Sequence, residues 1–174
     1  NGKAAAVVKA DAYGFGMTRI TKTLINAGCK YFYVANLDEA IELRKNIITK
    51  DITIAVFEGF FEGTEITYIN NKITPIINNL EQLKRLLSLF RQGKKIRAIL
   101  NINTGMNRLG CNSKEINFLK KNKNIVNELE WDFIMSHLAN SEDFKNVIND
   151  IQLNKLLEFS KNFPDIKLSF ANSC

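Results

Sequence analysis

Lys9 stands directly after the apolar run 4–8 and directly before a turn that contains Gly14 and Gly16. Short apolar runs bounded by turn residues are typical of buried strands, and the carboxyl ends of parallel strands face the functional side of a barrel. An ammonium group held there against apolar walls loses hydration and shifts toward the neutral amine, a nucleophile that forms a Schiff base with an aldehyde. Lys9 is therefore a candidate for amine chemistry. The alternative is a solvated lysine at the end of a strand.

Two more candidates follow other apolar runs. Arg108 lies in the segment 101–110, and its fixed fork of donors suits a carboxylate or a phenolate oxygen; the alternative is a surface arginine. His137, in the segment 136–141, is the only histidine of the chain. It is either a site residue or a structural one, and a single histidine does not build the usual catalytic zinc site, so no metal site is predicted.

Two hydroxyl groups complete the set of candidate side chains. Tyr13 lies in the turn after Lys9, and Ser173 lies in the last segment, 171–174. Backbone N–H groups near Gly14 and Gly16 allow an anion to approach closely. No pair of carboxylates is spaced for acid and base catalysis.

These residues must be positioned by the strands and helices that the sequence predicts, which alternate regularly along the chain. Asn36 with Glu39, and Asn79 with Gln82, predict helix starts, and a long helix is predicted at 142–162. The chain contains no glycine fingerprint of a nucleotide-binding sheet, so a parallel barrel is preferred over a doubly wound sheet. Its eighth strand is expected outside this sequence. Apolar runs predict seven strands, at 4–8, 31–35, 52–57, 73–77, 96–102, 131–135 and 166–171.

Composition narrows the class of protein. The chain has 174 residues with 45% hydrophobic content, enough for one domain or part of one. No apolar run approaches the ~20 residues that span a bilayer, so no membrane partner and a cytoplasmic location are expected. The cysteines, Cys29, Cys111 and Cys174, are odd in number and widely spaced, as expected of reduced thiols. The net charge of +6 is spread along the chain, which gives a nucleic-acid-binding module little support.

Four segments carry a resemblance to one enzyme family. Residues 6–14, Ala-Val-Val-Lys-Ala-Asp-Ala-Tyr-Gly, resemble the pyridoxal-phosphate attachment signature of alanine racemases. Residues 103–110, Asn-Thr-Gly-Met-Asn-Arg-Leu-Gly, resemble their second signature. Segments 136–139 and 171–173 are similar to two further motifs of the family, in the same order along the chain.

The resemblance implies a fold, a reaction and a role for each candidate. Residues 1–174 would be part of a pyridoxal-phosphate-binding (β/α)8 TIM barrel domain that lacks a following β-domain. Lys9 matches the lysine that attaches the cofactor and then serves as acid and base on one face of the substrate. Tyr13 and Ser173 match residues that hold the phosphate. Arg108 matches the arginine at the phenolic oxygen, near the substrate carboxylate, and His137 matches the histidine packed against the pyridine ring.

Four positions depart from the usual pattern of the family. Phe15 and Phe170 stand where histidines are common, and Asn103 replaces the more frequent aspartate. Asn101 stands where some members carry a lysine that becomes carbamylated. We expect no carbamate here, and a neutral Asn101 could orient Arg108 by a hydrogen bond.

The resemblance also implies a homodimer that interconverts L-alanine and D-alanine for cell-wall precursor synthesis. In the family, the base for the opposite face is a tyrosine of the second domain, contributed across the dimer interface. We expect this chain to be a piece of a longer protein, and the 174 residues alone not to racemise alanine appreciably. The alternative is a barrel that binds pyridoxal phosphate without racemase activity, as a carrier or homeostasis protein; the 104–110 signature favours the racemase.

Overall fold

The computed structural model describes residues 4–49, 51–143 and 145–170, and it divides into two compact units. Unit 1 comprises Asn1–Ile76 and unit 2 comprises Ile77–Cys174. Within the described ranges, no helix combines the length and the apolar character that crossing a membrane requires.

Unit 1 alternates strands and helices in a parallel sheet. Strand β1 pairs with β2, β2 with β3, and β3 with β4, all in parallel. Strands β2, β3 and β4 are almost completely buried at their centres, as in the run Phe32 to Val34. Such uniform apolar burial is what a parallel sheet covered by helices requires. The elements in chain order are β1 (Ala6–Val7), α1 (Lys9–Tyr13), α2 (Met17–Asn26), β2 (Tyr31–Val34), α3 (Leu37–Asn46), β3 (Thr53–Val56), α4 (Glu65–Asn71) and β4 (Ile73–Ile77).

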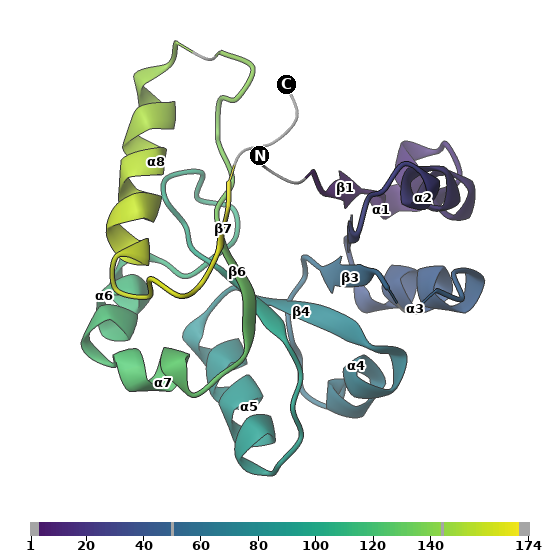
Figure 1. Cartoon of the computed structure of the whole chain (residues 1–174). Coiled ribbons are helices and arrows are strands. Elements are labelled where there is room, and N and C mark those ends of the chain that lie inside the picture. The colour runs from purple at the N-terminus through teal and green to yellow at the C-terminus, as the bar shows by residue number, and fades with distance from the viewer. Residues whose placement is uncertain (1–3, 50, 144, 171–174) are drawn as a thin grey trace. The chain divides into compact units, whose positions relative to one another are not determined.

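Unit 2 continues the same alternation. Strand β5 pairs with β6, and β6 with β7, again in parallel. Figure 1 shows helices α6 and α8 on the same side of strands β6 and β7. The elements in chain order are α5 (Leu80–Arg91), β5 (Ala98–Asn101), α6 (Ser113–Lys121), α7 (Lys123–Asn127), β6 (Trp131–Met135), α8 (Val147–Ser160) and β7 (Leu168–Ser169).

All seven predicted strands are present, and two of the predicted helix starts are confirmed. Asn36 and Asn79 each accept a hydrogen bond from the backbone N–H three residues later, at Glu39 and Gln82. The long helix predicted at 142–162 is shorter, because α8 begins only at Val147. The preceding residues form turns instead, as in the hydrogen bond from the Asn146 backbone N–H to the Asp143 carbonyl.

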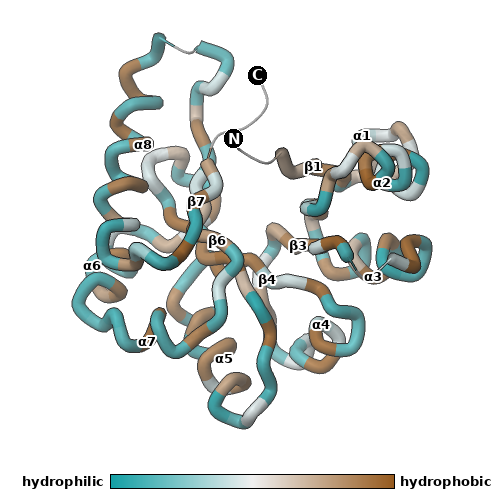
Figure 2. Tube along the Cα trace, in the orientation of Figure 1, coloured by the Kyte–Doolittle hydropathy of each residue, from teal (hydrophilic) through white to brown (hydrophobic). Residues whose placement is uncertain are grey.

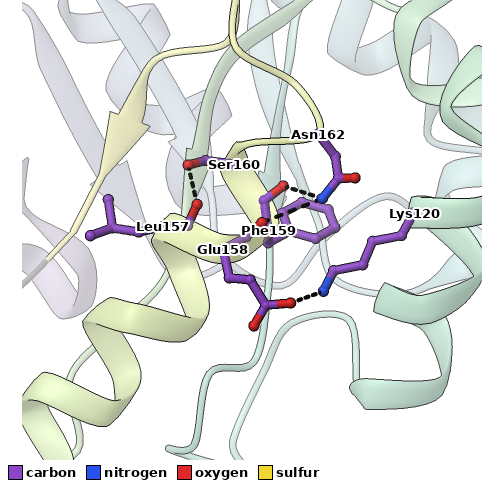
Figure 3. Close-up of polar contacts among 6 residues, drawn as sticks. All are labelled: Lys120, Leu157, Glu158, Phe159, Ser160 and Asn162. Carbon is purple, nitrogen blue, oxygen red and sulfur yellow. Dashed lines mark hydrogen bonds and ion pairs between the residues drawn. The ribbon is translucent and has the colours of Figure 1, made fainter.

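Helix α8 is joined to α6 by an ion pair. At its C-terminal end, the Ser160 hydroxyl donates to the Leu157 carbonyl and the Asn162 side chain donates to the Phe159 carbonyl. Figure 2 shows hydrophobic and hydrophilic residues alternating along α8, and its buried positions include Gln152, Leu156 and Phe159. Figure 3 shows the Lys120 ammonium of α6 against the Glu158 carboxylate, 2.6 Å apart. This ion pair joins the two helices at the protein surface.

The Lys120–Glu158 pair predicts how one carboxyl group titrates. The hydrogen bond from Lys120, followed by its charge, holds the pKa of Glu158 below its usual range. A lowered pKa stabilises the fold above the usual carboxyl pKa, and that stability is lost as pH falls through the lowered value. We expect Lys120→Met to raise the pKa of Glu158, as measured by a carboxyl carbon NMR titration, whereas Lys121→Met leaves it unchanged. An unchanged pKa in Lys120→Met would contradict the ion pair.

Candidate active site

The chain after Lys9 makes a tight left-handed turn. Residues 10–13 all have positive φ, from 51° to 56°, although none of them is glycine. Left-handed backbone costs roughly 1–2 kcal/mol for each residue with a side chain, so the turn needs outside support. Gly14, at φ 87°, ends it, and its N–H donates to the Ala10 and Asp11 carbonyls. Residues 10–13 are assigned to α1, and such sparsely populated backbone conformations cluster at functional sites.

The Glu39 carboxylate supplies much of that support. One of its oxygens accepts from the Ala10 backbone N–H over 2.8 Å, and the other accepts from the Ala35 N–H over 2.7 Å. Within the turn, the Asp11 carboxylate accepts from the Met17 N–H over 2.6 Å. Glu39, on α3, therefore joins the first residue after Lys9 to the end of β2. From the sequence, Glu39 is predictable only as part of a helix start, because its hydrogen bond to Ala10 spans 29 residues.

The Lys9 ammonium lies among aromatic rings. Its Nζ is 6.0 Å from the centre of the Tyr13 ring and 5.9 Å from that of the Phe57 ring. Phe57 stacks on Tyr33, with ring centres 5.2 Å apart. Ring faces attract a cation, so both rings are close enough to contribute to the setting of the half-buried Lys9 ammonium. Tyr13 itself is 60% exposed.

In unit 2, the 103–110 segment is a closed loop after β5. Its neck is held by the Cys111 N–H donating to the Asn101 carbonyl and the Asn103 N–H donating to the Cys111 carbonyl, at 2.9 and 3.0 Å. Inside the loop, the Asn103 side-chain oxygen accepts from the backbone N–H groups of Gly105 and Asn107. Its amide nitrogen also donates to the Asn107 side chain. An aspartate could accept the first two bonds but could not donate the third.

Arg108 is presented on this loop with an exposed side chain. Its guanidinium has no hydrogen-bond or ion-pair partner within residues 4–49, 51–143 and 145–170. Among the described residues, the expected hydrogen bond in which Arg108 would donate to the Asn101 side chain is not formed. The buried Asn101 amide donates instead to the Asn78 side chain over 2.8 Å, because Asn101 points into the packed base of the loop. The Arg108 guanidinium is thus exposed to solvent, with its N–H donors open to a ligand.

His137 follows β6 in a half-buried position. Its backbone carbonyl accepts a hydrogen bond of 2.9 Å from the Gln152 side chain, on α8. Gln152 was not predicted from the sequence, because a single glutamine within a helix gives no signal of function. Ser173 lies outside the described residues. The structure therefore brings Lys9 and Tyr13 together in unit 1 and places Arg108 and His137 on neighbouring parallel strand ends, after β5 and β6, in unit 2.

Gly110 closes the Arg108 loop where no side chain fits. Its φ is 101°, and a Cβ atom there would stand 2.8 Å from the Asn103 nitrogen and 2.9 Å from the Ile102 carbonyl carbon. These are backbone atoms of the loop neck, which cannot move without breaking the neck hydrogen bonds.

Comparisons with known proteins point to one family. Residues 1–174 match the family described as alanine racemase, N-terminal domain. Alanine racemase of Rickettsia prowazekii is 43% identical over 97% of this chain, and that of Brucella abortus is 40% identical over 98%. A crystal structure of alanine racemase from Bartonella henselae with covalently bound pyridoxal phosphate is 37% identical, with a TM-score of 0.92 over 98% of this chain.

The matched region is part of each relative. This chain spans 42% and 43% of the two curated relatives and 50% of the Bartonella henselae chain. The likeness confirms the expected fold, an incomplete parallel α/β barrel.

A pair of glycine substitutions tests the close approach at Gly110. We expect Gly28→Ala to lower the free energy of unfolding by about 1–2 kcal/mol, because Gly28 has a φ of 91° with open space around it. Gly110→Ala adds a backbone clash to the same conformational cost, so its loss should be larger. Urea unfolding of both variants makes the comparison. Equal losses would show that the loop neck yields freely.

Proposed function

The chain belongs to the alanine racemase family, whose N-terminal domain it matches over residues 1–174, and we propose that it is the cofactor-binding part of a pyridoxal-phosphate-dependent amino-acid racemase. The proposed reaction interconverts L-alanine and D-alanine, a precursor of the bacterial cell wall. We propose residues 1–174 as one partial barrel domain of that enzyme.

The observation that carries the proposal is the setting of Lys9. A primary amine stands half-buried between two aromatic rings, on a strained turn fixed by Glu39. Pyridoxal phosphate supplies an aldehyde that bonds an amine and a ring that withdraws electrons from the substrate α-carbon. The donor set fits this group, because an amine, a solvated guanidinium and an imidazole suit its aldehyde, its phenolate oxygen and its ring. The bound cofactor of the Bartonella henselae relative adds support.

Each candidate residue receives one task under this proposal, and the motif matches support the assignment. Lys9 would attach the cofactor, would be released when the amine of the substrate takes its place, and with its free amine would then remove or return the α-proton on one face of the amino acid. Tyr13 and Ser173 hold the phosphate. Arg108 bonds the phenolic oxygen and orients the substrate carboxylate, and His137 packs against the pyridine ring.

The wider setting of the enzyme belongs to the same proposal. The whole protein would act as a homodimer in the cytoplasm, on a free amino acid, with no nucleic acid or membrane as partner. The exposed Arg108, on the loop after β5, supports a racemase over a simple carrier in this proposal, because a guanidinium can bond the carboxylate of an amino-acid substrate.

Trapping the attachment site tests the proposal. With pyridoxal phosphate, the protein should develop the absorbance of a bound cofactor, and borohydride reduction followed by peptide mapping should place the label on Lys9. Lys9→Ala should lose both signals, because no other amine has the same setting within the described residues. Lys22→Ala, an exposed lysine of α2, is the matched control and should keep both. A label that persists in Lys9→Ala would overturn the role of Lys9.

A further inference from the structure

A chain of buried polar side chains in unit 2 joins the Arg108 loop, the His137 segment and helix α8. Thr104, Ser136 and Gln152 are only 2%, 3% and 0% exposed. They come from the Arg108 loop, from the segment after β6 and from helix α8. Buried polar groups are retained only where their hydrogen bonds are made, so the partners of these three show what the chain does.

Both the nitrogen and the oxygen of the Gln152 side-chain amide form hydrogen bonds, and these bonds reach two different loops. Its nitrogen donates to Thr104 Oγ1 over 3.1 Å and to the His137 carbonyl over 2.9 Å. Its oxygen accepts from the Ala139 backbone N–H over 2.9 Å. A primary amide has two N–H donors and one oxygen, so both donors and the acceptor are engaged.

Counting protons fixes the direction of the remaining bonds. Ser136 Oγ donates its one proton to the Ile102 carbonyl over 2.8 Å, so it must accept from Thr104 Oγ1, which is also 2.8 Å away. Thr104 then has no proton left for Gln152 and must accept from it. Gln152 therefore donates to Thr104, Thr104 donates to Ser136, and Ser136 donates to the Ile102 carbonyl just after β5. Each donor has only one acceptor open to it in this chain of hydrogen bonds.

The Arg108 loop also rests on this side chain by packing. A Cβ atom added to Gly105 would be 3.4 Å from Gln152 Cγ and 3.7 Å from its Cδ, so the loop backbone lies directly against the amide stem. Gln152 thus fixes the start of the Arg108 loop by a hydrogen bond to Thr104 and by contact with Gly105. It also fixes the backbone on either side of Leu138, by hydrogen bonds to the His137 carbonyl and the Ala139 N–H.

We propose that Gln152 is a positioning residue that sets the Arg108 loop and the His137 segment relative to each other for cofactor binding. This inference rests on the proposed function, because it presumes that both segments serve the same cofactor. Gln152 itself acts through its neighbours. The competing view is that it only satisfies buried groups, in which case any equal loss of stability in α8 would have the same effect.

The single histidine allows a direct test without cofactor. In Gln152→Met, which keeps the volume but loses every hydrogen bond, the His137 ring Hε1 signal should shift or broaden, and the Ala139 amide should exchange about tenfold faster. Gln152→Glu keeps an acceptor for Ala139 but has no N–H for Thr104 or for the His137 carbonyl. It should therefore shift the His137 signal while the Ala139 amide stays protected. Leu156→Ala, one turn along α8 and fully buried, is the matched control and should leave the His137 signal in place.

Cofactor affinity gives the second readout. The apparent Kd for pyridoxal phosphate should rise about tenfold in Gln152→Met and Gln152→Glu, and stay near the wild-type value in Leu156→Ala at a temperature where all are folded. If Gln152→Met does not fold, Gln152→Glu decides. Wild-type affinity and an unmoved His137 signal in a folded Gln152 variant would overturn the inference, as would equal effects in Leu156→Ala. Failure of the wild-type protein to bind pyridoxal phosphate would instead overturn the proposed function and, with it, the role in cofactor binding.

Discussion

Hydrogen bonds between helix side chains and strand-end loops are the interactions on which this structure depends. The Glu39 carboxylate holds the turn after Lys9, and the Gln152 amide holds the segments around Thr104 and His137. Four left-handed residues cost several kcal/mol together, at roughly 1–2 kcal/mol each, whereas one buried hydrogen bond contributes only about 0.5–1.5 kcal/mol. The turn therefore persists because several bonds and the packed sheet fix it at once, and Glu39 is the bond that comes from outside it.

This arrangement explains how a parallel sheet can hold reactive side chains in fixed positions on its loops. Loops at strand ends have few partners of their own, and a reacting amine must be held within a fraction of an ångström of its target. In both units the support comes from a helix. The Lys9 turn is supported by α3, which follows the next strand, β2. The His137 segment and the Arg108 loop are supported by α8, which follows the His137 segment. The side chains that contact the cofactor in the proposal can then stay partly or fully exposed, because their backbones are already fixed.

Sequence patterns predicted the strands and the motif residues but not the supports. The strands were predictable because buried parallel strands require apolar runs, and the starts at Asn36 and Asn79 because capping is local. The left-handed turn was not, since Ala10 and Ala12 carry no preference for it. Glu39 and Gln152 were missed because their bonds reach 29 and 48 residues along the chain, and a single polar residue in a helix is usually solvated. The start of α8 was placed five residues early because the residues before Val147 have a helix-compatible composition.

The most direct test of the account is a crystal structure of the protein grown with pyridoxal phosphate. The account predicts continuous electron density from the Lys9 Nζ to the cofactor, with the 10–13 turn unchanged and the Glu39 carboxylate still bonded to Ala10. A cofactor attached to a different lysine, or bound away from the Lys9 turn with that turn relaxed to right-handed backbone, would contradict it.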